Sequence, residues 1–264
     1  MADKPVYIYL CYGPSPHTVR ELRYSLETLL PEIRGDASRI AIFTDRPANF
    51  AELPVRTFDV SADLGAMRGG ARYGHRVKLA VHVRALQTFG RPCVLLDTDS
   101  FIREGFDSKV SDALAAGAAM NEFVRADPYP GFGPFETNLP NLGRYVLDPK
   151  ESLMYNSGLT AARPEHAPLI EDAIVLIDRL WSAGLKRHDL DQFAVSECFR
   201  LGGVPLREIN REFEHYFPRW SKRYMRRRLR ERSAGEKIAF SKTRVRLFKG
   251  MWNLRLGLRK WRRS

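Results

Sequence analysis

The sequence has few of the features that mark secreted, disulfide-stabilised or membrane-spanning proteins. Its 264 residues include three widely spaced cysteines, an odd number that argues against an oxidised secreted scaffold. No run approaches the ~20 apolar residues of a transmembrane helix. The first residues lack the charged start and apolar stretch of a signal peptide. We therefore expect a cytoplasmic protein, and a chain of this length can bury a core without help from disulfides or metals.

Acidic residues are scarce in only one part of the chain. The whole sequence has 43 Lys and Arg against 31 Asp and Glu, a net charge of +12. Residues 219–264 hold 18 of the basic residues and only two acids, Glu231 and Glu236, so this tail carries +16 and the rest carries −4. A uniformly basic enzyme is therefore excluded, and we expect a mildly acidic domain over 1–218 followed by a basic tail over 219–264.

The body of the chain alternates strand-like and helix-like patterns. Short apolar runs that end at turn residues predict strands over 6–12, 39–45, 55–60, 92–97 and 204–209. Apolar residues at helical spacing predict helices over 16–30, 77–89, 164–180 and 189–199. This alternation predicts an α/β fold with a mostly parallel sheet flanked by helices.

Residues 125–150 break the alternation. Five prolines and three glycines interrupt any period there, and four aromatic residues lie among them. A stretch of this length without secondary structure is unusual inside a compact domain. Two interpretations stay open, a surface excursion and a lid or acceptor-binding loop.

The most informative segment is the apolar strand that ends in Asp97-Thr98-Asp99. Open α/β sheets bind ligands at the carboxyl ends of their parallel strands. Two carboxylates repel each other there unless a cation lies between them, and their oxygens suit Mg²⁺ or Mn²⁺. One alternative is a pair of turn or helix-capping aspartates. Another is the nucleophile motif of haloacid-dehalogenase-like phosphatases, but that motif normally lies on the first strand and is followed by a second acidic motif, which this sequence lacks.

Several short motifs follow one another in a characteristic order between residue 6 and about residue 200. Each is weak alone, and the ordered set resembles the GT-A-fold glycosyltransferases, which use nucleotide-diphosphate sugars. The matching segments are Tyr12-Gly13, Ile42–Asp45, Tyr73–Leu79, Asp97–Asp99, Tyr155–Gly158 and Asp189–Phe193.

The resemblance implies a Rossmann-like GT-A domain with a nucleotide-binding half over 1–100 and an acceptor half over 101–218. It implies a hexosyltransferase-like enzyme that moves a sugar, with a UDP-sugar as the favoured donor, to a cell-surface glycan, a glycolipid or a similar acceptor. The cofactor would be Mn²⁺ or Mg²⁺. The residues implied for the site are Asp97 and Asp99 as metal ligands, Tyr12 and Asp45 near the nucleotide, and Asn156, Ser157 and Gln192 near the sugar.

Four further site residues are predicted with alternatives left open. Arg76 and Lys78 are two positions apart on a helix, so at most one is expected to face phosphate, and the bidentate guanidinium favours Arg76. Asp191 is the predicted functional carboxylate, and the general base if the reaction inverts the anomeric centre, with Asp189 as the helix N-cap. His215 is either a third metal ligand or a structural histidine, because the sequence after it lacks the glycine and Lys-Pro of the family's pattern.

Gly158 indicates a turn that needs unusual backbone angles. The same angles would account for this glycine without any functional role.

The basic tail contains two apolar stripes at helical spacing, on nearly opposite sides of one helix. Basic helices with Trp and Leu bind anionic membrane surfaces, which would place the protein at the inner face of a membrane. Packing or oligomer contact, nucleic-acid binding and a disordered tail are the alternatives, and nucleic acid is the disfavoured partner. A second function class also stays open, a non-catalytic membrane- or nucleic-acid-binding protein on an α/β scaffold. The stripes are Leu247, Met251, Leu254, Leu258 and Trp261, and Val245, Phe248, Trp252 and Leu256.

Overall fold

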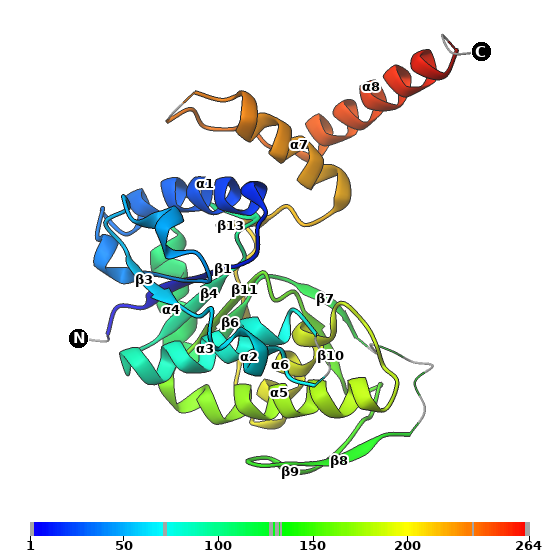
Figure 1. The fold of residues 1–264 in the computed structure, drawn as a ribbon. Helices are drawn as coiled ribbons and strands as arrows, with labels where there is room; N and C mark the ends of the chain where they lie inside the picture. Colours follow the sequence, from blue (N-terminus) through cyan, green and yellow to red (C-terminus); the bar gives the residue numbers. More distant parts are fainter. Residues whose placement is uncertain are drawn as a thin grey trace.

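A seven-stranded sheet forms the centre of the molecule in the computed structural model (Figure 1). The structure describes residues 3–70, 73–126, 129, 132, 134–233 and 235–261, with the side chains of all of these except 126 and 253–261. The strand order is β12-β6-β11-β4-β1-β2-β3, and only β11 runs antiparallel to its neighbours. The predicted mostly parallel α/β fold is therefore confirmed. The strands are β1 Val6–Cys11, β2 Ile40–Thr44, β3 Arg56–Asp59, β4 Cys93–Leu96, β6 Ala118–Met120, β11 Leu159–Ala162 and β12 Leu206–Glu208.

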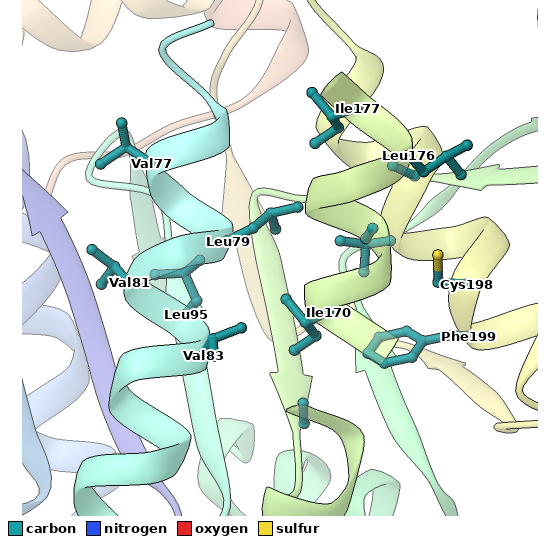
Figure 2. Close-up of a cluster of buried hydrophobic side chains, with 14 of the residues drawn as sticks. Val77, Leu79, Val81, Val83, Leu95, Ile170, Leu176, Ile177, Cys198 and Phe199 are labelled. Atoms are coloured by element: carbon teal, nitrogen blue, oxygen red, sulfur yellow. The ribbon is translucent and has the colours of Figure 1, made fainter. Parts of the chain in front are cut away.

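Helices cover both faces of this sheet (Figure 1). On one face α1 (Pro16–Glu32) and α4 (Phe106–Ala116) pack against alternate residues of the central strands. On the other face lie α3 (Arg76–Phe89), α5 (Ala167–Ser182) and α6 (Leu190–Leu201), and the short α2 (Leu64–Arg68) packs beside α3. Figure 2 shows how aliphatic side chains of α3 and α5 meet each other and Leu95 of β4. This packing fixes α3 and α6 relative to β4, and all three carry residues of the site described below.

The segment 125–150 contains more regular structure than its composition predicts. β7 (Phe123–Ala126) pairs with β10 (Leu153–Tyr155), and β8 (Glu136–Leu139) forms a hairpin with β9 (Gly143–Val146). The expectation of a stretch without secondary structure was wrong here. These strands are only three or four residues long and β8 and β9 are largely exposed, so they carry too short an alternation to stand out between prolines and glycines.

The first part of the basic tail packs on the body. α7 (Arg219–Glu231) lies along α1, where Arg226 Nε is 2.8 Å from Glu21 Oε1 and Arg232 forms an ion pair with Glu27. α8 (Lys242–Trp261) then extends away from the sheet (Figure 1). The two helices share a hydrophobic cluster with the body, made of Tyr24, Phe101, Tyr216, Tyr224, Met225, Leu229, Ile238, Val245 and Phe248.

None of the helices in the described part of the chain combines the length and the apolar character needed to cross a membrane.

One buried histidine makes the stability of this core sensitive to pH. His82 on α3 is fully buried, and its Nε2 lies 3.2 Å from the Cys93 carbonyl oxygen, to which it donates. Burial lowers the pKa of His82 from 6.5 to about 4. Since the unfolded chain binds this proton more readily, the free energy of unfolding falls as the pH drops from 6.5 towards 4.

We expect His82 alone to lower the unfolding free energy by about 2 kcal/mol between pH 7 and pH 5. Urea unfolding at the two pH values measures the loss, and a His82→Leu variant should lose about 2 kcal/mol less than the wild type over the same interval. An equal loss in both proteins would show that His82 is not responsible.

Candidate functional site

Asp97, Asp99 and His215 meet just beyond the carboxyl end of β4. The two aspartates follow that strand directly, and the Asp97 N–H donates to the Gly158 carbonyl oxygen at 2.8 Å. The next strand, β5 (Ser100–Ile102), pairs with β13 (Phe213–His215) in a register that sets His215 opposite Ser100. His215 Nε2 consequently lies 3.4 Å from Asp97 Oδ2 and 3.6 Å from Asp99 Oδ2. One ligand atom from each of the three residues falls within 4.8 Å of the others.

A hydrogen bond from the ring of His215 determines which of its nitrogens faces the carboxylates. Asn156 Oδ1 accepts the Gly158 N–H at 2.8 Å and lies 2.9 Å from His215 Nδ1. Because Asn156 presents an acceptor, Nδ1 carries a proton, and Nε2 is the ring nitrogen that faces Asp97 and Asp99 and would offer its lone pair to a bound ion. Ligand histidines in metal sites are oriented in this way. The arrangement gives Asn156 the role of fixing the histidine.

This set of donors fits a divalent metal ion. Two carboxylates and an imidazole are ligands that Mn²⁺ accepts, and the carboxylates also suit Mg²⁺. Burial would raise the pKa of the Asp99 carboxyl, but His215 and Lys222 lower it well below its ordinary value, so it is ionised at neutral pH. Asp97, Asp99 and His215 are thus the residues that would hold the ion, with His215 as the third ligand.

Gly158 is required here for space and not for backbone angles. Its φ is not in the left-handed region, so the expectation of unusual backbone angles was wrong. A Cβ at this position would lie 2.2 Å from Nδ1 of His215, closer than any real contact. The glycine lets the imidazole pack directly against the backbone of the turn after β10.

Lys78 and Asp191 form a buried ionic network beside the three ligands. Lys78 Nζ lies 2.8 Å from Asp97 Oδ1 and 3.6 Å from Asp191 Oδ2, and it donates to the Ser157 carbonyl oxygen at 3.1 Å. Asp191 accepts hydrogen bonds from Ser157 Oγ at 2.8 Å and from the Tyr73 hydroxyl at 2.9 Å. Burial would raise the pKa of Asp191, but Lys78, His75 and these hydrogen bonds lower it below its ordinary value. The network therefore holds a fixed positive charge next to the aspartates.

The structure does not bring Arg76 to this cluster. Its guanidinium forms a bidentate ion pair with Asp178 of α5, at 2.9 and 3.0 Å, and donates to the carbonyls of Ala66 and Met67. Only one of the two basic residues faces the site, as the spacing predicts, but that residue is Lys78. The sequence pattern did not show which face of α3 turns towards the end of β4.

A small pocket of about 210 Å³ opens beside the aspartates. Tyr12 lines it, and the Tyr12 hydroxyl donates to the Gly74 carbonyl oxygen at 3.2 Å. Asp45 sits at the neighbouring strand end, where both carboxylate oxygens lie 3.1 Å from the Gly13 nitrogen. Asp45 is not among the residues that line this pocket, so its contact in the structure is with the turn that carries Tyr12.

A larger cleft of about 680 Å³ adjoins the small pocket and shares His75, Lys78, Asp97 and Asp99 with it. Gln192, Asn156 and Ser157, which the resemblance implies near the sugar, line this cleft. Asp189 lies here at the N-cap of α6, but its carboxylate accepts from the Tyr129 hydroxyl at 2.9 Å and makes no capping hydrogen bond. The lining residues are His75, Lys78, Asp97, Asp99, Glu122, Phe123, Val124, Arg125, Met154, Asn156, Ser157, His188, Asp189, Asp191, Gln192, His215, Phe217 and Lys222.

Some of these residues were missed by the sequence reasoning. Lys222 Nζ lies 2.8 Å from Asp99 Oδ2, although Lys222 belongs to the basic tail and was counted only towards its charge. In the sequence, the feature that could have indicated this contact is the position of Lys222 seven residues after His215. Phe123, Val124 and Phe217 line the cleft with 42–48% of their surface exposed, and no periodic pattern marks them.

Comparisons with known proteins leave the chain without a family assignment. No protein-family model and no curated protein sequence matches it. Among solved structures, the apo form of mouse xyloside xylosyltransferase 1 is similar over 78% of this chain and 84% of its own, with 15% sequence identity and a TM-score of 0.45. A likeness at this level concerns the course of the chain in space and assigns no substrate to this protein.

Proposed function

We propose that this protein is a metal-dependent glycosyltransferase that takes its sugar from a nucleotide diphosphate, with a UDP-sugar as the first donor to test. The observation that carries the proposal is the convergence of Asp97, Asp99 and His215 at the place where two pockets meet. The same aspartates and Lys78 line both the small pocket and the large cleft. A ligand with a nucleotide on one side and a sugar on the other would place its diphosphate between them.

The charges at this junction suit a diphosphate leaving group. A divalent cation bound there would supply Lewis-acid stabilisation of the negative charge that develops on the departing diphosphate. Lys78 and Lys222 contribute two fixed ammonium groups within 3 Å of Asp97 and Asp99. Such preorganised charges stabilise a departing anion without reorganisation of solvent.

Asp191 is best suited to an anchoring role. It is 2% exposed, its two oxygens accept from Tyr73 and Ser157, and its pKa is lowered. A carboxylate held in this state is a weak proton acceptor. We therefore favour Asp191 as the residue that positions Lys78 and Ser157, while its predicted role as general base stays a prediction.

The larger cleft is the proposed acceptor side. Phe123 and Val124 of β7 and Phe217 expose apolar surface at the cleft, beside polar groups that include Glu122 and Gln192. Aromatic surfaces flanked by polar groups suit ligands that have both an apolar face and hydroxyl groups. A sugar ring has this character, and so does a glycoside with an aromatic aglycone.

We expect Phe123→Ala to raise the KM for the acceptor about tenfold, since ~1.5 kcal/mol of aromatic contact is lost. Val124→Ala and Val146→Ala form a matched pair, because both valines are 42–49% exposed and only Val124 lines the cleft. Initial rates of transfer to a panel of p-nitrophenyl glycosides measure the effect. An equal KM in Phe123→Ala and wild type, or an equal effect of the two valine changes, would remove the acceptor assignment.

The proposed function is tested by donor turnover in the absence of acceptor. The protein is incubated with Mn²⁺ and a panel of UDP-, GDP-, CDP- and dTDP-sugars, and release of the nucleotide is followed. We expect slow, metal-dependent hydrolysis of at least one donor and none after chelation. Absence of binding and turnover with every donor would favour the non-catalytic scaffold, and release of phosphate from simple phosphate esters would favour a phosphatase.

A further inference from the structure

We propose that the groove between α7 and α8 is a binding site for an anionic phospholipid in a bilayer surface. The groove has a volume of about 640 Å³ and lies between the two tail helices. Arg227 and Arg228 line it from α7, and Arg244, Leu247 and Met251 line it from α8. This site is separate from the cleft around Asp97 and Asp99, with which it shares no lining residue.

The two apolar stripes of α8 differ in burial in the structure. Val245, Phe248 and Trp252 turn inward, and the Phe248 ring lies 5.7 Å from that of Tyr224 on α7. Leu247 and Met251 form the other stripe and are 63% and 57% exposed. The remaining stripe positions, Leu254, Leu256, Leu258 and Trp261, lie outside the residues whose side chains are described. Among the described side chains, folding therefore packs Val245, Phe248 and Trp252 against the body and α7 and leaves Leu247 and Met251 facing solvent at the groove.

Leu247 and Met251 are the most exposed of the large apolar side chains in the described part of the chain. They stand one helical turn apart on α8, and Arg244 precedes Leu247 by three residues on the same face. An apolar pair beside arginines is the arrangement by which a helix inserts into the boundary between headgroups and acyl chains.

The charge around the groove complements an anionic surface. Residues 219–264 carry +16. Glu231 also lines the groove and pairs with Arg227 and Arg228, but the lining arginines Arg227, Arg228 and Arg244 outnumber it, so the groove keeps a positive charge. Each further basic group near a membrane of anionic lipids adds roughly 1 kcal/mol of attraction. A polyanion such as RNA would use the charge alone, because an exposed Leu and Met offer nothing to phosphates. The apolar pair favours the bilayer.

The experiment measures co-sedimentation of the full chain with vesicles of phosphatidylcholine alone and of phosphatidylcholine with phosphatidylglycerol. We expect binding to the anionic vesicles only, weakening as salt rises. Arg244→Gln/Arg246→Gln removes the groove arginine of α8 and the exposed arginine two positions after it, and should weaken binding about fivefold per charge. Leu247→Ser/Met251→Ser should weaken it roughly tenfold or more.

Matched variants on the body separate these effects from a general loss of charge or apolar surface. Lys109→Gln/Arg207→Gln removes two exposed charges, and Val146→Ser/Leu201→Ser removes two exposed apolar side chains. Both should bind vesicles as the wild type does. Circular dichroism of each variant confirms folding, so that loss of binding is not loss of structure.

Three results with the vesicles would overturn the proposal: equal binding to neutral vesicles, unchanged binding by Leu247→Ser/Met251→Ser, or equal weakening in the body variants. A fluorescent RNA of mixed sequence is titrated in parallel. If RNA binds at least as tightly as the anionic vesicles, the groove is a polyanion site and the lipid assignment fails. None of these outcomes depends on donor turnover.

Discussion

Asp99→Asn is expected to lower metal-dependent donor hydrolysis by about 10³-fold, because several kcal/mol of stabilisation of the leaving group is lost with the ion. The substitution keeps the shape of the side chain and removes one charged oxygen ligand from the group formed with Asp97 and His215. It also removes the charge that Lys222 faces at 2.8 Å. Calorimetric titration with Mn²⁺ should show no binding in the variant at concentrations that saturate the wild type.

The matched control for this change is Asp112→Asn on the exposed face of α4. It makes the same chemical change, from a carboxylate to an amide, at a residue that lines neither pocket. It should leave both Mn²⁺ binding and hydrolysis at wild-type levels. Thermal unfolding without metal checks that Asp99→Asn is folded. Mn²⁺ binding by the folded variant with wild-type affinity would show that Asp99 is not a ligand.

Gly158→Ala is expected to disable the site through sterics alone. The added Cβ would lie 2.2 Å from Nδ1 and 2.6 Å from Cγ of His215, so the ring must move away from Asn156 and from the two aspartates. Displacing a ligand from its orienting hydrogen bond typically costs 10- to 100-fold in metal affinity, and we expect roughly 100-fold here. Overpacking should also lower the unfolding free energy by about 1–3 kcal/mol.

Two comparisons isolate this steric effect. Gly65→Ala places a methyl group on α2 with no atom within 4 Å. It should lower neither the metal affinity nor the free energy of unfolding. The double variant Gly158→Ala/His215→Ala removes the clash, so stability should recover while metal binding stays lost. Failure of the double variant to recover stability, or wild-type metal affinity in Gly158→Ala, would contradict the close approach of His215.

The central sheet and the aspartate pair follow from local sequence. The apolar runs that end at Tyr12, Asp45 and Asp97 form the three adjacent parallel strands β1, β2 and β4, because runs of β-branched and aromatic residues closed by turn residues suit buried strands. The position of Asp97 and Asp99 at a carboxyl strand end follows from the same pattern. Asn156 and Ser157, named for their Asn-Ser-Gly motif, line the cleft beside these aspartates.

Other features depend on contacts between distant segments, which local patterns do not contain. The choice between Arg76 and Lys78 is made by Asp178 on α5, 102 residues further along the chain from Arg76. The requirement for glycine at 158 is set by a histidine 57 residues away, brought there by the pairing of β13 with β5. Lys222 reaches Asp99 because α7 packs on α1 through Arg226 and Glu21.

The basic tail is a second case in which local sequence does not determine which residues are buried. Its sequence displays two similar apolar stripes, and only the packing of α8 on α7 distinguishes the buried stripe from the exposed one. Composition alone therefore predicted a basic amphipathic segment without showing which of its faces remains available to a partner.

The most direct test of the proposed function is a crystal structure of the protein soaked with Mn²⁺ and UDP, with diffraction data recorded at the manganese edge. We predict one anomalous peak within bonding distance of Asp97, Asp99 and Nε2 of His215, with the diphosphate of UDP in contact with it and with Lys78. A peak elsewhere, or UDP bound away from these residues, would contradict the assignment of this site.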